Sequence, residues 1–103
     1  MKSTMELKMP DIESQTADHQ LSGKSRDMHN AILSLREELE AIDSYNLRAE
    51  VCSNKEFRKI LLHNRDEEKE HACMLLEWMR RNDPKLADEL KNCLFTKKSI
   101  AKS

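Results

Sequence analysis

The sequence predicts an all-α protein: an antiparallel two-helix hairpin followed by a short third helix. The 103 residues include only one glycine and two prolines, and residues that favour helices dominate. Apolar residues also recur at alternating steps of three and four along two long stretches, which is typical of helices that pack in a heptad pattern. A hairpin in which 36% of residues are charged buries little by itself. We therefore expect two copies to dimerise into a four-helix bundle.

The first long helix is expected from about Ser25 to Val51. Residues 1–24 are polar and lack sustained periodicity, so we interpret them as a flexible lead-in. The predicted apolar seam of the helix consists of Met28, Ala31, Leu35, Glu38, Ile42, Tyr45, Ala49 and Cys52.

The second long helix is expected from about Lys55 to Arg81. Ser53 or Asn54 would cap it, and Ser53 with Glu56 three residues later has the spacing of a capping box. Its predicted seam consists of Leu61, Asn64, Glu68, His71, Leu75 and Trp78.

A short third helix should follow the second. Asp83 before Pro84 indicates an N-cap followed by proline at the first helical position, and the helix is expected to continue to about Leu94. The predicted domain covers residues 25–95, and residues 96–103 form a basic, frayed tail.

Composition excludes several classes of protein. The net charge is −1 with both signs interspersed, so nothing indicates a nucleic-acid partner. Apolar runs are too short for a membrane span, and the N-terminus lacks a signal-peptide core. The cysteines, Cys52, Cys73 and Cys93, are odd in number and widely spaced, which favours reduced thiols in a cytoplasmic protein over a cluster or zinc site.

Both seams contain charged or ionisable residues where a heptad pattern favours apolar side chains. Glu38 lies 15 residues before the turn at Ser53, and Glu68 lies 15 residues after it. The two carboxylates should therefore face each other at one level of the hairpin, and His71 should lie one turn beyond Glu68 on the same face. Unpaired carboxylates in a seam would cost several kcal/mol, so a divalent metal is the expected compensation.

One chain thus supplies two carboxylates and one imidazole. Ferritin-like di-iron bundles use twice that set, which a two-fold axis between two copies would complete. Oxygen and imidazole ligands suit iron, manganese or zinc. Two alternatives remain open. One is a structural or adaptor dimer in which the polar residues of the seam only set the register of the helices. The other is a dimer that binds zinc or manganese without oxidase chemistry.

Several stretches resemble the encapsulated ferritins. The resemblance covers roughly Ala31 to Thr96. The matching stretches are Glu37-Glu38-Leu39-Glu40-Ala41 with Tyr45, His63-Asn64-Arg65-Asp66-Glu67-Glu68-Lys69-Glu70-His71, Leu76-Glu77-Trp78, Arg80-Arg81-Asn82-Asp83 and Leu94-Phe95-Thr96. The block from His63 to His71 is long enough to be specific.

The resemblance implies a ferroxidase with a di-iron centre between two subunits, ring-shaped decamers of five dimers, and a place as cargo inside an encapsulin shell in the cytoplasm. By position, Glu38, Glu68 and His71 match the metal ligands, and Tyr45 matches a tyrosine close to the centre. Glu37 and Glu40 match acidic residues of a metal entry site, where calcium or another divalent cation would bind.

The sequence departs from the family pattern at two places. Ser44 stands where the family often has tryptophan, which alters the expected surroundings of the site but none of its ligands. No encapsulin-targeting peptide is evident in Thr96–Ser103. We therefore expect that the chain is truncated, is made as a fusion, or is delivered by other means.

Each of these residues also has an ordinary structural interpretation. Glu37 and Glu40 could form a solvated acidic face, and Tyr45 could be part of the core. His63 with Glu67 fits a solvated pair better than a metal site. Trp78 is expected to serve packing, and Cys73 to be a buried or interface thiol.

Overall fold

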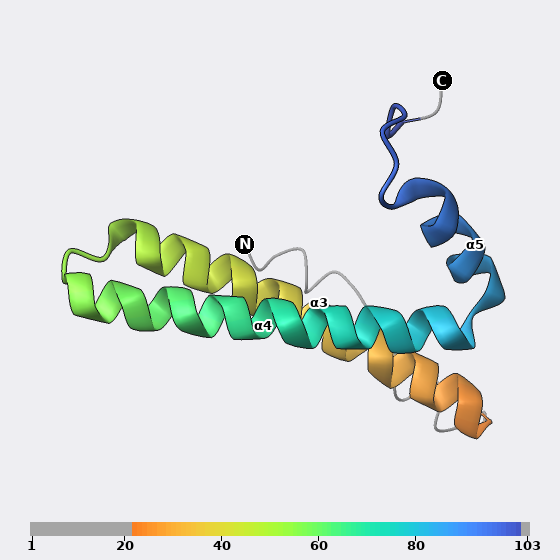
Figure 1. Ribbon diagram of the computed structural model, residues 1–103. Coiled ribbons are helices and arrows are strands. Elements are labelled where there is room, and N and C mark those ends of the chain that lie inside the picture. Colours follow the sequence, from red (N-terminus) through yellow and green to blue (C-terminus); the bar gives the residue numbers. More distant parts are fainter. Residues whose placement is uncertain (1–21, 102–103) are drawn as a thin grey trace.

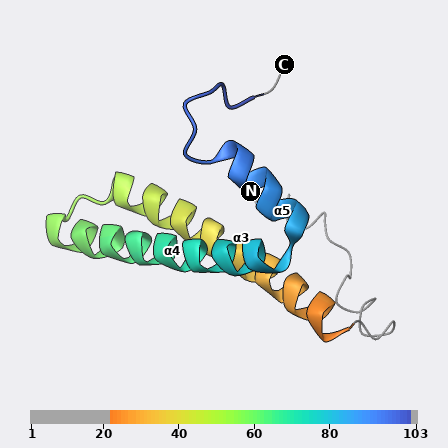
Figure 2. The same cartoon turned by 45° about the vertical axis from the view of Figure 1, so that its right-hand side comes forward.

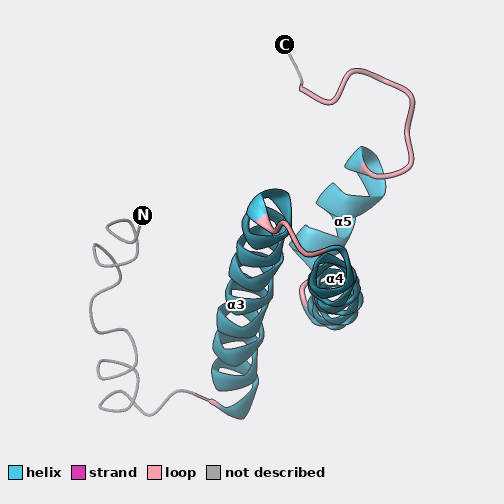
Figure 3. Ribbon diagram, turned by 90° about the vertical axis from the view of Figure 1, so that its left-hand side faces the viewer, coloured by secondary structure: helices cyan, strands magenta, loops and turns pink. Residues whose placement is uncertain are grey.

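The structure is a computed structural model that describes residues 22–101, and every regular element in that range is a helix (Figure 1). The elements are α3 (Gly23–Val51), α4 (Lys55–Asn82) and α5 (Pro84–Cys93). Helices α3 and α4 run antiparallel and side by side, and α5 leads away from the end of α4 (Figures 1 and 3). The predicted hairpin with a short third helix is confirmed.

Helix α3 begins two residues earlier than the sequence indicated. The side chain of Ser22 accepts a hydrogen bond of 3.1 Å from the backbone N–H of Ser25, which makes Ser22 the N-cap and Gly23 the first helical residue. The rest of the predicted lead-in, residues 1–21, lies outside the described residues.

Helix α4 is capped by Asn54 and not by Ser53. The Oδ1 atom of Asn54 accepts a hydrogen bond of 2.8 Å from the backbone N–H of Phe57. The capping box expected for Ser53 and Glu56 is therefore wrong, because the helix begins one residue too late for that pairing.

The junction between α4 and α5 follows the predicted pattern. Asp83 caps α5 by accepting a hydrogen bond of 3.1 Å from the backbone N–H of Leu86, and Pro84 occupies the first turn. Helix α5 contacts α4 but not α3, and it rises away from the hairpin (Figure 2). Residues 94–101 are not helical.

All eight seam positions predicted for α3 are buried or half-buried. The predicted seam of α4 is only partly correct, because His71 and Trp78 are exposed while Met79 is buried. At this end of the hairpin, α4 turns Met79 toward α3 in place of Trp78. Trp78 therefore lies at the edge of the contact between the two helices, with 37% of its surface exposed.

The hairpin has a thin core. Among the described residues, only Ala31, Ala49, Leu61 and Met79 are buried. Large apolar side chains are exposed on both long helices, among them Ile32, Leu39, Leu47, Phe57, Ile60, Met74 and Trp78. Burying such a side chain stabilises a protein by roughly 1.5–3 kcal/mol, so these surfaces favour association with other chains. None of the described helices is both long and apolar enough to cross a bilayer.

Candidate metal centre

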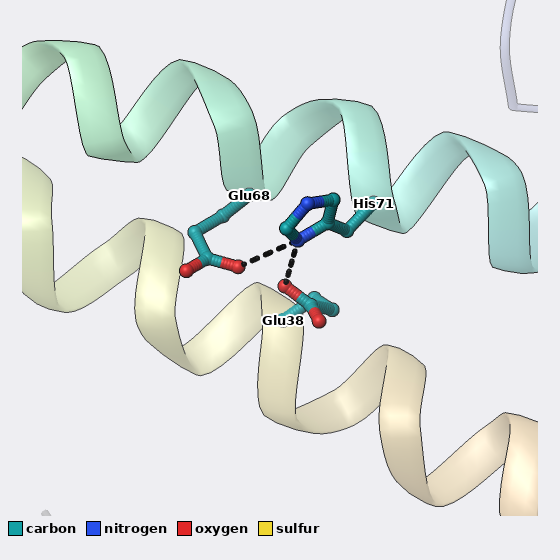
Figure 4. Close-up of side chains that lie close together, drawn as sticks. All are labelled: Glu38, Glu68 and His71. Carbon is teal, nitrogen blue, oxygen red and sulfur yellow. Dashed lines mark hydrogen bonds and ion pairs between the residues drawn. The ribbon is translucent and has the colours of Figure 1, made fainter.

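Three side chains that could ligate a metal meet halfway along the hairpin, where α3 and α4 face each other. Glu38 comes from the middle of α3, and Glu68 and His71 come from successive turns of α4 (Figure 4). One ligand atom from each residue lies within 4.8 Å of the others. The structure therefore brings together the three residues that the sequence placed at one level.

The imidazole lies between the two carboxylates. Nδ1 of His71 is 3.3 Å from Oε1 of Glu68 and 3.5 Å from Oε1 of Glu38 (Figure 4). About a quarter of each glutamate side chain is exposed, whereas the histidine side chain is 51% exposed. The cluster is thus closed on the seam side and open where the imidazole reaches solvent.

One carboxylate oxygen in this cluster has no hydrogen-bond partner. Oε1 of Glu38 is buried, and no donor, including the nearby imidazole, reaches it in bonding geometry. A buried oxygen left without a donor costs free energy comparable to a lost hydrogen bond or more. A cation placed between the three side chains would satisfy it.

The two carboxyl groups have opposite pKa shifts. The hydrogen bond between them raises the pKa of Glu38, and partial burial and the negative charge of Glu68 add to that shift. The same hydrogen bond lowers the pKa of Glu68, aided by His71. The surroundings of the cluster thus favour the neutral form of the Glu38 carboxyl group and the ionised form of the Glu68 carboxyl group.

The pKa of His71 is raised. Desolvation opposes its ionisation, but the hydrogen bond to Glu68 and the negative charges of both glutamates outweigh that effect. A proton on His71 or Glu38 would compete with a bound cation for the same ligand atoms.

The other residues singled out from the sequence lie outside this cluster. Glu37 and Glu40 flank Glu38 on α3 and are exposed. Tyr45 is half-buried, two turns along α3 from Glu38 and on the same face, which corresponds to roughly 10 Å along the helix axis.

Two features near the cluster were not anticipated from the sequence. The guanidinium of Arg48 lies 5.3 Å from the centre of the Tyr45 ring, a cation–π arrangement for which the three-residue spacing on a helix is a weak signal. Arg65 donates a hydrogen bond of 3.1 Å to Asn46, which ties α4 to α3. That contact depends on the register of the hairpin, so no local pattern could reveal it.

The donor set fits a hard or borderline divalent metal. Two carboxylates and one imidazole suit iron, manganese or zinc, and a single chain leaves further coordination positions open. The cysteines contribute nothing to it. Cys52, Cys73 and Cys93 are free, and Cys73 is exposed in the single chain, so its expected place at an interface stays a prediction.

A helical hairpin with a carboxylate–histidine cluster at its centre carries the same types of ligand as the helices of ferritin-like di-iron bundles. Comparison with known proteins agrees. The EncFtn-like family model matches residues 13–97, which is most of the chain. The protein therefore belongs to the EncFtn-like family.

Individual relatives carry related names. The chain is 56% identical over 72 residues to the encapsulated ferritin-like protein of Rhodospirillum rubrum, which covers 70% of this chain and 51% of the relative. It is 36% identical over 62 residues to the encapsulin nanocompartment cargo protein EncC of Myxococcus xanthus, covering 60% of this chain and 48% of the relative. The matches thus span about half the length of these two curated relatives.

A solved structure has the same fold. The crystal structure of protein ne0167 from Nitrosomonas europaea superposes with a TM-score of 0.79 at 62% sequence identity, covering 82% of this chain and 93% of that one. The hairpin with its third helix is therefore an arrangement that a close relative also adopts.

Proposed function

We propose that two copies of this chain pair about a two-fold axis and oxidise Fe²⁺ with dioxygen at a di-iron site between them. The convergence of Glu38, Glu68 and His71 around a buried oxygen without a donor carries the proposal. Each copy provides half of the ligand set of a ferritin-like di-iron bundle, and the two-fold axis supplies the rest.

The charges and positions of the residues support distinct roles. Four carboxylates from two copies would balance two Fe²⁺ ions. Glu38 would bridge them, because the axis would bring both copies of this residue together, whereas Glu68 and His71 would each bind one ion from the side. Any proton on Glu38 or His71 would have to leave before these side chains could bind metal.

Two bound Fe²⁺ ions would each give one electron to dioxygen, which would take up two protons from solvent and leave as hydrogen peroxide, and the two Fe³⁺ ions would leave for storage. The protein fixes the two ions at close range and leaves coordination positions open. Zinc or manganese in the same ligands would give a metal-binding protein without this reaction.

Three further residues are proposed to serve the centre. Glu37 and Glu40 are exposed beside Glu38, and such carboxylates raise the local concentration of cations, so they would form an entry site at which calcium or another divalent cation also binds. Tyr45, on the same face of α3, would act close to the centre.

The assembly and the location of the protein are proposed from its family. The names of the relatives from Rhodospirillum and Myxococcus describe an encapsulated protein and an encapsulin cargo. We propose accordingly that this chain forms decamers of five dimers, with residues 25–95 as the folded unit, inside an encapsulin shell in the cytoplasm.

Oxidation of iron is the direct test. The purified protein is loaded anaerobically with Fe²⁺, exposed to air and followed by the absorbance of Fe³⁺, with Glu38→Ala as the test variant and Glu50→Ala, an exposed glutamate on the same helix, as the matched control. We expect oxidation well above the buffer rate for the native protein and the control, and the buffer rate for Glu38→Ala.

The alternatives predict other outcomes. A structural or adaptor dimer would bind no metal at all. A zinc or manganese protein would bind metal in a Glu38-dependent manner without accelerating oxidation. Because the proposed site needs two copies, metal should also shift the equilibrium toward larger species; identical native mass spectra with and without iron would contradict a shared site.

A further inference from the structure

An arginine on α4 reaches across the hairpin beside the metal centre. Nη1 of Arg65 donates a hydrogen bond of 3.1 Å to Oδ1 of Asn46 on α3. The other nitrogens of the guanidinium face Asp66, with Nε and Nη2 each 3.0 Å from its Oδ1. Only 24% of the Arg65 side chain is exposed, the same fraction as for Glu68. Arginine side chains are mostly exposed in proteins, so these contacts hold an unusually well-covered one in place.

Arg65 and His71 lie on opposite flanks of Glu68. Arg65 precedes Glu68 by three residues, and His71 follows it by three. Three residues of a helix span a rotation of about 300°, so the two side chains point about 60° to either side of the one between them. Helix α4 is therefore joined to α3 on one flank by the hydrogen bond between Arg65 and Asn46. On the other flank, Nδ1 of His71 lies 3.5 Å from Oε1 of Glu38.

The apolar seam does not fix the rotation of α4 by itself. Its buried residues on α3 are Ala31 and Ala49, and such short side chains interlock only weakly with a facing helix. At the open end, α4 turns Met79 toward α3 although the heptad spacing favoured Trp78. The short turn limits sliding of one helix along the other, but it leaves α4 free to roll about its own axis.

A roll of α4 would disturb the metal centre. Glu68 and His71 would move together, whereas Glu38 would stay behind on α3. A rotation of about 20° displaces an atom that lies about 6 Å from the helix axis by roughly 2 Å. Metal–ligand distances tolerate only about a tenth of that displacement. A contact that prevents rolling therefore decides whether the three ligands can bind one ion together.

The charge of Arg65 does not influence the centre directly. Asp66 balances that charge at 3.0 Å. The pKa of Glu68 is lowered by its hydrogen bond to Glu38 and by His71, and Arg65 makes no contribution to the shift. Substitution of Arg65 should therefore change where the ligands lie rather than the electrostatic field around them.

We propose that Arg65 is a positioning residue of the metal centre, whose hydrogen bond to Asn46 stops α4 from rolling. It thereby keeps Glu68 and His71 in place against Glu38. Arg65 binds no metal itself, because a guanidinium has only donors. The inference rests on the proposed function, since the ligands that Arg65 positions are those of the proposed site.

The first test changes the acceptor on α3 and uses Co²⁺ as the probe, because its visible absorption depends on the geometry of its ligands. Asn46→Leu removes the acceptor, whereas Asn46→Asp keeps an oxygen at the same place. Asn46→Leu should weaken Co²⁺ binding by about tenfold or more and change the Co²⁺ spectrum. Asn46→Asp should retain the native affinity and spectrum. Native values in Asn46→Leu would overturn the proposal.

The second test removes the donor. Arg65→Met keeps the apolar part of the side chain and should reproduce the loss seen in Asn46→Leu, and the double variant should be no worse than either single one. Arg80→Met is the matched control, because Arg80 also lies on α4 but donates its hydrogen bonds of 2.7–2.8 Å to Glu77 of the same helix. An equal loss in Arg80→Met, or additive losses in the double variant, would refute a role for this cross-helix contact.

A measurement without metal separates this proposal from the proposed reaction. In the metal-free protein, nuclear Overhauser effects between the His71 ring and the Glu38 side chain should be present in the native chain and in Asn46→Asp, and should weaken in Asn46→Leu. That pattern in a protein that oxidises no iron would contradict the proposed reaction and support the positioning role. Unchanged effects in Asn46→Leu would overturn the positioning role even where the native protein oxidises iron.

Discussion

The centre and the ends of the α3–α4 seam use the same spacing of residues for different purposes. At the ends, the buried positions are apolar: Ala31 and Met79 at the open end, and Ala49 and Leu61 near the turn. At the centre, the same faces present Glu38, Glu68 and His71. The apolar contacts at the two ends of the seam therefore hold the helices together, and the polar cluster lies between these contacts.

This division explains how the cluster is tolerated. A carboxylate oxygen without a donor destabilises the single chain locally. The apolar contacts on either side fix the distance between the helices, so the three side chains cannot separate to be solvated independently. Substitutions at the ends should accordingly change stability, and substitutions at the centre should change metal binding.

The largest expected effect is at the turn end of the seam. Leu61 is only 2% exposed, so Leu61→Ala should lower the free energy of unfolding by about 2–5 kcal/mol through lost burial and an unfilled cavity. Urea unfolding of the metal-free protein at fixed concentration measures it. Leu47→Ala, at a position 63% exposed, should stay within about 0.5 kcal/mol; equal losses in both would contradict the assignment of the core.

A substitution in the central cluster should change metal binding and leave the stability of the metal-free protein almost unchanged. His71→Ala should weaken Fe²⁺ or Zn²⁺ binding by at least about tenfold, because one ligand of each half-site is lost, while the urea midpoint without metal changes little. Calorimetric titration under anaerobic conditions measures the binding. His63→Ala, which removes an exposed histidine paired with Glu67 at 3.3 Å, is the control; a similar loss there would show that the metal binds elsewhere.

The sequence predicted the seam of α3 and the position of the metal cluster better than it predicted the ends of α4 and the direction of α5. The seam of α3 and the level of Glu38 with Glu68 follow from helical spacing alone, because a short turn fixes the register. The sequence alone could not show whether Ser53 or Asn54 caps α4, since the side chains of both can accept the same kind of hydrogen bond. The rotation that buries Met79 and exposes Trp78 depends on how the two helices cross, and the direction of α5 depends on tertiary contacts; no local pattern contains either.

The raised pKa of His71 and the competition between protons and metal predict pH dependences of opposite sign for the stability of the metal-free protein and for its affinity for metal. The raised pKa of His71 stabilises the metal-free fold below the ordinary histidine value, and that contribution is lost as pH rises through the raised value. Metal binding must displace this proton, so affinity should fall as pH decreases, by up to about tenfold per pH unit. Titrations in buffers of different ionisation enthalpy would count the released protons, and a pH-independent affinity would contradict the proton arrangement.

The smallest expected effect lies at the end of α4, away from both the core and the centre. Arg80 and Arg81 hold the carboxylate of Glu77 through hydrogen bonds of 2.7–2.8 Å and lower its pKa to about 2. A lowered pKa contributes stability that is present above the ordinary glutamate value and is lost as pH falls toward 2. Because these side chains are exposed, the contribution is small.

Glu77→Gln isolates this contribution. The native protein should be slightly more stable than the variant at pH 6, and the two should converge as the pH is lowered toward 2, when Glu77 becomes protonated in both the folded and unfolded states. Thermal unfolding along a pH series measures the difference, with Glu50→Gln as the control, since Glu50 is exposed and forms no ion pair with any residue that the structure describes. A difference that stays constant with pH would mean that Glu77 acts through packing against its neighbours rather than through its charge.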